Sequence, residues 1–156
     1  MTPRTGRGLA ACAAVAIAAG TAAAAEEPIA ADELSSPDWR DCAGHFFFVA
    51  RMIDREGDAE MHQRFTGLAY LAMYAGEEKA KAERDAGDTA NGRGETLADP
   101  ETGELQVNVR KMVTAHAAKA QAQGQGPYVD AYADKCSDPV LAFSERFTER
   151  MESGGE

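Results

Sequence analysis

The sequence predicts an all-α domain, a bundle-like arrangement of four to five helices closed by one disulfide. Three observations lead to this fold. Apolar residues recur at three- and four-residue steps along most of the segment 36–152. No segment shows the alternation of polar and apolar residues that is typical of a β-strand. Two cysteines follow an N-terminal export signal, and an even number of cysteines in an exported protein indicates a disulfide.

Residues 1–25 have the three-part layout of a secretory signal peptide. Arg4 and Arg7 form its basic part, a short apolar run follows them, and Ala23 and Ala25 match the small residues that precede a cleavage site. The apolar run is too short to span a bilayer as a helix. We therefore expect cleavage after Ala25 and a mature protein that is secreted or periplasmic.

A second interpretation of the same segment is a lipoprotein signal. Residues 9–12 read Leu-Ala-Ala-Cys, which matches the short motif in which the cysteine receives a lipid. That processing needs an apolar stretch before the motif, whereas here the apolar stretch follows Cys12. We therefore favour removal of Cys12 together with the signal peptide.

The chain is acidic, with 26 Asp and Glu residues, 16 Lys and Arg residues and a formal net charge of −10. Loss of the two signal arginines makes the mature chain more acidic still. Such a charge disfavours nucleic acid and anionic membrane surfaces as partners. No second apolar stretch is long enough to span a membrane. We expect a soluble protein whose partner is another protein or a small molecule, with no nucleic acid and no membrane span.

Residues 26–35 form a polar, Ala-rich lead without periodicity, which we expect to be disordered. The first helix should begin at Ser36, with Pro37 at its first position, and end at Gly57. One apolar stripe runs along it: Trp39, Cys42, Phe46, Val49 and Ile53. Further phenylalanines lie off this stripe, so we expect the helix to be buried on more than one side.

A second helix is predicted over residues 58–85, with Asp58 as its cap and Gly87 beyond its end. Its inner face is apolar and comprises Met61, Phe65, Leu68, Ala72 and Ala75. Residues 77–84 are charged nearly all round, which indicates that they project into solvent. Residues 86–104, rich in glycine and acidic residues, then form a long loop or a hinge.

A third helix is predicted over about residues 104–123, and residues 124–126 break it. One face of this helix carries Leu105, Val109, Met112, Val113, His116 and Ala120. A short helix over residues 127–135 should then place Tyr128 and Tyr132 on the same side as Cys136.

The last helix should be capped by Ser137 or Asp138 and carry Pro139 in its first turn. Val140, Phe143, Phe147 and Met151 recur along it at helical spacing. Residues 153–156 form a tail that we expect to be loose.

Cys42 and Cys136 are the two cysteines of the mature chain, and we expect them to form one structural disulfide. The alternatives are a redox-active pair or two thiolate ligands. Neither cysteine belongs to a C-x-x-C motif, so the structural role is favoured. In the chain-entropy model a bond that closes so long a loop stabilises at the high end of about 2–5 kcal/mol.

His116 is the strongest candidate for a ligand or metal site, because it is the ionisable residue centred on an apolar helical face. Its alternative role is that of a core histidine with a satisfied hydrogen bond, and we favour that role. His45 and His62 lie at the edges of their stripes and would have to converge with His116 on one zinc. No two histidines are spaced as a metal pair on one helix. Asp41 and His45 are spaced as a surface i,i+4 contact.

A haem held between helices by methionine and histidine is a further alternative. Met61, Met73 and Met112 are available for it together with His116. Methionine in a helix more often fills a gap in the core. We therefore expect no cofactor.

No catalytic motif is present. The acidic stretch that opens at residues 88–92 does not match a calcium-binding loop, and no nucleophile elbow, P-loop or dinucleotide fingerprint occurs. We therefore expect a protein that is not an enzyme.

The residues Trp39-Arg40-Asp41-Cys42, with the late Cys136, resemble the small periplasmic acid-stress chaperones, which are helical and carry one disulfide. The resemblance covers only these residues and the helical pattern. It implies a stress- or envelope-related protein that works by binding. Our leading hypothesis is therefore an exported helical protein that binds a protein or a small ligand. The alternative is a small cofactor- or metal-binding protein that uses His116.

Overall fold

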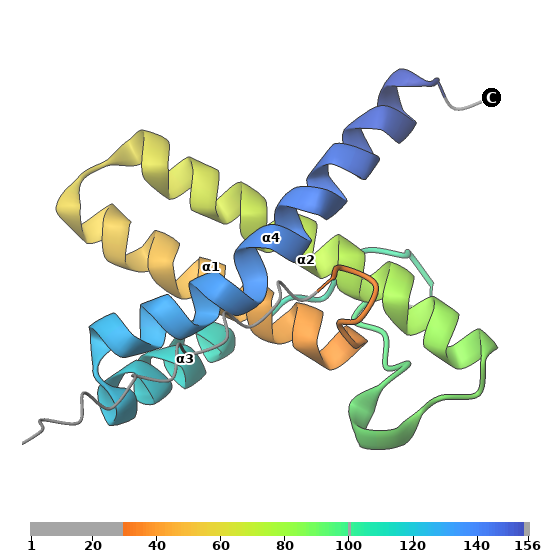
Figure 1. Ribbon diagram of the computed structural model, residues 1–156, viewed down its shortest axis with the longest axis horizontal. Helices are drawn as coiled ribbons and strands as arrows, with labels where there is room; N and C mark the ends of the chain where they lie inside the picture. Colours follow the sequence, from red (N-terminus) through yellow and green to blue (C-terminus); the bar gives the residue numbers. More distant parts are fainter. Residues whose placement is uncertain (1–29, 100, 155–156) are drawn as a thin grey trace, which may run out of the picture.

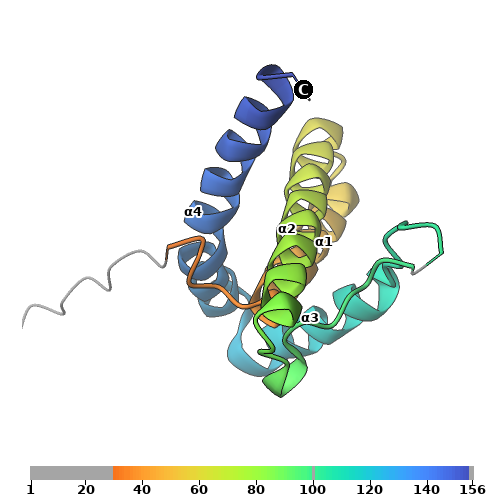
Figure 2. The same cartoon turned by 90° about the vertical axis from the view of Figure 1, so that its right-hand side faces the viewer.

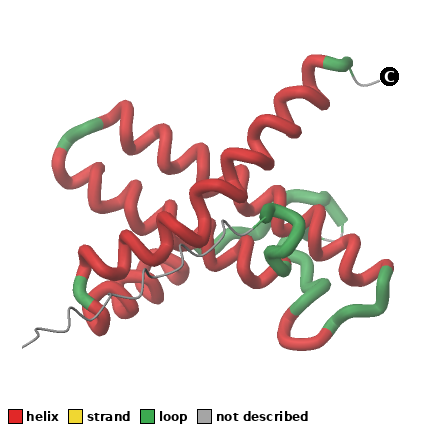
Figure 3. The backbone as a smooth tube through the Cα atoms, in the orientation of Figure 1, coloured by secondary structure: helices red, strands yellow, loops and turns green. Residues whose placement is uncertain are grey.

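A computed structural model describes residues 30–99 and 101–154 of this chain. They form four α-helices and a short 3₁₀ helix, η1 (Ala90–Gly92). Within this described part there is no β-strand, only an isolated bridge between Ala98 and Leu105 (Figure 3). The predicted all-α, bundle-like fold is thus confirmed. The predicted signal peptide, residues 1–25, lies outside the described residues, as do residues 26–29 and the end of the predicted tail.

Helix α1 (Ser36–Glu56) is the centre of the fold and contacts each of the three other α-helices (Figures 1 and 2). Ser35 caps it, because its hydroxyl accepts from the Asp38 backbone N–H while the Asp38 carboxylate accepts from the Ser35 backbone N–H. Gly57 ends it in the left-handed conformation, with φ of 83°. All nine residues from 42 to 50 are buried, which confirms that this helix is covered on several sides.

The expectation that residues 26–35 are disordered is wrong for residues 30–35. Residues 26–29 lie outside the described part, but Leu34 is only 3% exposed and belongs to the main core. Lys79 on the next helix donates a hydrogen bond to the backbone carbonyl of Asp32. The lead is thus ordered from residue 30 because one apolar side chain and one capping serine attach it to the bundle.

Helix α2 (Ala59–Asp85) is capped as predicted by Asp58, whose carboxylate accepts from the Met61 N–H. The expectation that residues 77–84 project into solvent holds for one face of the helix, which includes Glu78 and Lys81, but is wrong for the face that carries Ala80 and Glu83. Glu83 is only 6% exposed, and its carboxylate accepts hydrogen bonds from the Ser36 N–H and hydroxyl and from the Gly94 N–H. The reason is that the first turn of α1 presents free N–H groups, which bind a carboxylate well.

The loop after α2 is folded rather than a free hinge. Arg40 donates to the carbonyls of Gly92 and Glu95, and Arg84 donates to the carbonyl of Gly94. Glu77 accepts from the Leu97 N–H at 2.7 Å. These bonds fasten the loop along α2 and the start of α1.

Helix α3 (Val109–Gln123) begins five residues later than predicted. Residues 104–108 are extended instead, because the Gln106 N–H donates to the Leu97 carbonyl and the Asp99 N–H donates to the Glu104 carbonyl. Asn108 then caps the helix by accepting from the Lys111 N–H.

Helix α4 (Gln125–Glu152) is one continuous helix, so the prediction of two helices separated near residue 136 is wrong. Pro139 lies inside it and lacks the N–H that would bond to the carbonyl one turn earlier, at Lys135. The ribbon changes direction in this middle region (Figure 1). Proline therefore bends the helix rather than ending it, and neither Ser137 nor Asp138 acts as a cap.

A disulfide joins Cys42 in α1 to Cys136 in α4, with an S–S distance of 2.02 Å and a Cα–Cα distance of 5.5 Å. Both cysteines are fully buried. The core around them is built from all three of the helices α1, α2 and α4 and includes Trp39, Phe46, Phe47, Met73, Val140 and Phe143. No helix within the described residues is long and apolar enough to span a bilayer.

Candidate functional site

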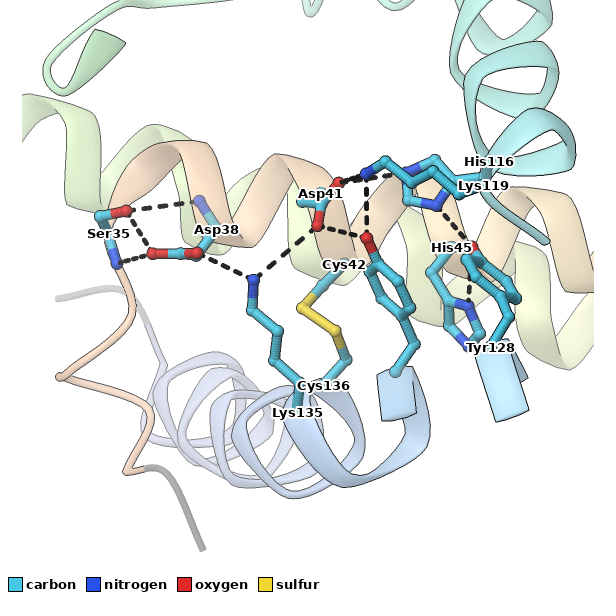
Figure 4. The surroundings of a disulfide bond; sticks show 11 residues. Ser35, Asp38, Asp41, Cys42, His45, His116, Lys119, Tyr128, Lys135 and Cys136 are labelled. Atoms are coloured by element: carbon cyan, nitrogen blue, oxygen red, sulfur yellow. Dashed lines mark hydrogen bonds and ion pairs between the residues drawn. A yellow bond between two sulfur atoms is a disulfide. The ribbon is translucent and has the colours of Figure 1, made fainter. Parts of the chain in front are cut away.

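A group of buried and half-buried polar side chains lies beside the disulfide, where α1, α3 and α4 meet (Figure 4). We call it the Tyr128 cluster. It consists of Asp41 and His45 from α1, His116 and Lys119 from α3, and Tyr128 and Tyr132 from α4. Its members interact across three helices, so the cluster positions α3 against the rest of the bundle.

His116 is only 4% exposed, and both of its ring nitrogens have partners. Nδ1 lies 2.5 Å from the Tyr128 hydroxyl, and Nε2 lies 3.3 Å from Oδ1 of Asp41. The imidazole also packs on the backbone of Gly44, where an added Cβ would come within 2.5 Å of Nε2. His116 therefore has the hydrogen bonds expected of a core histidine.

Asp41 is the centre of charge in the cluster. Its Oδ1 lies 2.6 Å from Lys119 Nζ, and its Oδ2 accepts from the Tyr132 hydroxyl at 2.7 Å. Lys135 Nζ lies 3.8 Å from the same carboxylate. Burial alone would raise the pKa of Asp41, but hydrogen bonds from His116, Lys119 and Tyr132 outweigh it and hold the pKa well below its usual range. The carboxylate is thus ionised and fully partnered.

His45 lies deeper than the sequence suggested. The predicted surface contact with Asp41 is wrong, because His45 is 2% exposed and its Nδ1 lies 3.3 Å from the Tyr128 hydroxyl. Its ring stacks on Tyr132 with a centroid distance of 4.9 Å. Burial, together with the neighbouring His116, lowers the pKa of His45 to about 4. His45 is therefore a neutral side chain at physiological pH.

One direction of donation satisfies every partner in the cluster. In the tautomers that we assign from these contacts, the His45 Nδ1–H donates to the Tyr128 hydroxyl, this hydroxyl donates to Nδ1 of His116, and the His116 Nε2–H donates to Asp41. In the described residues no buried side-chain nitrogen or oxygen lacks a partner. Burial also raises the pKa of Tyr128, whose hydroxyl stays protonated. The chemical result is a closed and rigid network rather than a group aimed at a substrate.

A groove lies on the α3 side of this cluster and encloses about 410 Å³. We call it the α3 groove. It is lined by Pro37, Arg40, Asp41, Leu97, Gln106, Val107, Asn108, Lys111, Met112, Ala115, His116 and Lys119. Seven of the twelve lining residues are polar or charged, yet most of the exposed surface of the groove is apolar, as in many small-molecule sites.

The structure brings together some of the predicted site residues and separates others. His116 and Met112 both line the α3 groove, and His45 lies behind Tyr128 in the same cluster. His62 takes no part in the cluster, because its Nδ1 is bonded to the Ala50 carbonyl at 2.9 Å. Within the described residues no three His, Cys, Asp or Glu side chains are arranged to hold a metal ion.

Sequence reasoning missed several members of the site. Lys111 and Lys119 are not among the predicted site residues, although both line the groove. Lys119 is eight residues from Lys111, and Ala115 lies midway, so the i,i+4 spacing places all three on one face of α3. That spacing is the signal that could have indicated the groove wall.

Two further clefts are less suited to a small ligand. The larger, about 560 Å³, lies between α2 and the C-terminal half of α4. Its lining is mostly charged, with Glu78 and Arg150 forming an ion pair there. The smaller, about 280 Å³, lies near Phe65 and Leu141.

Comparison with known proteins found no match to this chain, whether with a family model, a curated protein or a solved structure.

Proposed function

We propose that this protein is exported and acts by binding a small ligand in the α3 groove, without catalysing a reaction on it. The observation that carries the proposal is the groove itself, which has mostly apolar walls and a floor fixed by the Tyr128 cluster. A binding site whose walls are already in place loses less entropy when the ligand enters. The disulfide beside the groove also keeps its walls in place, because it joins α1 to α4.

The partners within the cluster argue against catalysis. A general acid or base must reach the atom on which it acts. Tyr128 is fully buried, both nitrogens of His116 have protein partners, and the Asp41 carboxylate has three donors. These groups are already committed to one another.

The alternative function is a cofactor- or metal-binding protein in which His116 is a ligand. Either ring nitrogen would have to give up its present partner, Tyr128 or Asp41, in order to bind zinc or haem iron. No contact of His116 in the structure favours that exchange, so metal or cofactor binding enters the experiment below only as a possible result.

Thermal unfolding of the oxidised mature protein with a panel of small fragments tests the proposal, because a ligand that binds only the folded state stabilises it. Ala115 is exposed and lines the groove, so Ala115→Trp should block it and abolish the stabilisation. Ala118 is exposed on the same helix and does not line the groove, so Ala118→Trp is the matched control.

Fragments that stabilise the parent and the Ala118→Trp variant, but not Ala115→Trp, would support the proposal. Fragments that stabilise all three proteins equally would place binding elsewhere and contradict it. Zinc and haemin belong in the same panel. Stabilisation by either one that disappears in His116→Leu would overturn the proposal in favour of the cofactor- or metal-binding alternative.

A further inference from the structure

We infer that the ligand of the α3 groove is a small carboxylate with an apolar body. This inference rests on the proposed function and deepens it by naming the chemical class of the ligand. It follows from the character of the groove walls and from the balance of charges around them.

The walls require an apolar body. Leu97 and Val107, from the segment between α2 and α3, line the groove together with Met112 and Ala115 of α3. Leu97 and Val107 are half-buried and pack on the main core, so they are held in place rather than mobile. An apolar ligand would remove this surface from water, and the gain is proportional to the area covered.

The charges around the groove favour an anion. Three cations line it, Arg40, Lys111 and Lys119, and the lining contains one carboxylate, that of Asp41. This local excess of positive charge is unusual in a chain with a net charge of −10. The Asp41 carboxylate is already neutralised by Lys119 and the hydrogen bonds of the cluster, so it leaves no unpaired negative charge for a cationic ligand.

Lys111 is the cation best placed to receive the carboxylate. Arg40 is engaged by the carbonyls of Gly92 and Glu95 and lies 3.6 Å from the Glu95 carboxylate, and Lys119 is engaged by Asp41. Lys111 is exposed and forms no ion pair within residues 30–99 and 101–154. It lies in the first turn of α3, which contains no acidic residue, so the positive end of the helix dipole adds to its charge.

Isothermal titration calorimetry of the oxidised mature protein with three probes tests whether the ligand is a carboxylate. Octanoate, 1-octanol and octylammonium share one apolar body and differ in the charge of the head group. Octanoate should bind most tightly, 1-octanol more weakly, and octylammonium most weakly, because the lining favours negative charge.

Charge reversal at Lys111 supplies the residue-level test. Lys111→Glu should weaken octanoate binding roughly tenfold, because it replaces an attraction with a repulsion of similar size, and it should leave 1-octanol binding unchanged. Lys81→Glu is the matched control, since Lys81 is exposed on α2 and lies outside the groove. This substitution changes the net charge of the protein by the same amount as Lys111→Glu. It should leave octanoate binding nearly unchanged.

The outcomes separate this inference from the proposed function. If 1-octanol or octylammonium bound as tightly as octanoate, the carboxylate class would be wrong while the groove remained a binding site. If Lys111→Glu and Lys81→Glu weakened octanoate binding equally, the inference would also be wrong, since the preference for octanoate would then depend only on the net charge of the protein. If none of the three probes bound, the class would be wrong, and the proposed function would then be decided by the fragment panel and the Ala115→Trp variant.

Discussion

Replacing Gly44 by alanine tests how closely α1 and α3 approach each other at His116. In an open helix position, glycine to alanine stabilises a protein by about 1 kcal/mol, because alanine has the higher helix propensity. At Gly44 the added Cβ would lie 2.5 Å from Nε2 and 2.7 Å from Cδ2 of the imidazole. Non-bonded heavy atoms do not approach a Cβ atom so closely, so His116 would have to move.

Two costs then oppose the gain in propensity. Forcing an extra methyl group into a packed site costs about 1–3 kcal/mol. Moving the imidazole also disturbs its contacts with Asp41 and Tyr128, and a buried polar group that loses its partner costs about 1–3 kcal/mol. The two costs together exceed the gain in propensity, so we expect Gly44→Ala to lower the free energy of unfolding by about 1–5 kcal/mol, which is the opposite sign to the propensity effect.

Urea unfolding followed by circular dichroism measures this difference. Gly67→Ala is the matched control, because Gly67 lies inside α2 with open space around its Cα and should gain about 1 kcal/mol. In a His116→Ala background the Gly44→Ala change should cost much less, since the obstructing ring is gone. A Gly44→Ala variant as stable as Gly67→Ala would refute the close approach that we describe.

Replacing both Cys42 and Cys136 by serine should lower the melting temperature while leaving helical circular dichroism in place, because the bond closes a separation of 94 residues; unchanged stability would refute a stabilising role. Because the pKa of His45 falls from its usual value near 6.5 to about 4, the unfolded state binds more protons between these values, so stability should decrease as the pH falls from about 6.5 to about 4. Urea titrations across this range should show a smaller decrease in His45→Phe, and an identical pH profile would contradict the assignment. Glu83→Gln should destabilise the protein by about 1–3 kcal/mol, since an amide NH₂ would face the donors of Ser36, and hydrogen exchange of the Gly94 amide should accelerate. Intact mass of the exported protein should correspond to a chain that begins at Glu26, whereas a lipidated chain beginning at Cys12 would show that the lipoprotein motif is used.

The features that could be predicted from the sequence are those with a local physical signal. Asp58 caps a helix because its side chain reaches an N–H group three residues away, and Gly57 ends a helix because glycine adopts a positive φ without strain. The disulfide could be predicted as well, because cleavage of the predicted signal peptide would leave one pair of cysteines. Such signals depend only on neighbours in the chain.

The features that the sequence did not reveal depend on partners far apart in the chain. The charged residues 77–84 of α2 gave no sign of burial, because Glu83 binds Ser36 in the first turn of α1, which is 47 residues away in the chain. The cluster around Asp41 was missed for the same reason, since Lys119 is 78 residues distant. Pro139 illustrates a different limit, because proline either starts a helix or bends one, and tertiary packing decides which of the two occurs.

Amide chemical shifts of the protein titrated with octanoate show whether the ligand binds in the α3 groove. We expect shifts at the backbone amides of Leu97, Val107, Lys111, Met112 and Ala115, which line the groove on two sides. The amides around Glu78 and Arg150, in the larger cleft between α2 and α4, should not move. Shifts concentrated in that second cleft, or spread evenly over the helices, would contradict the account.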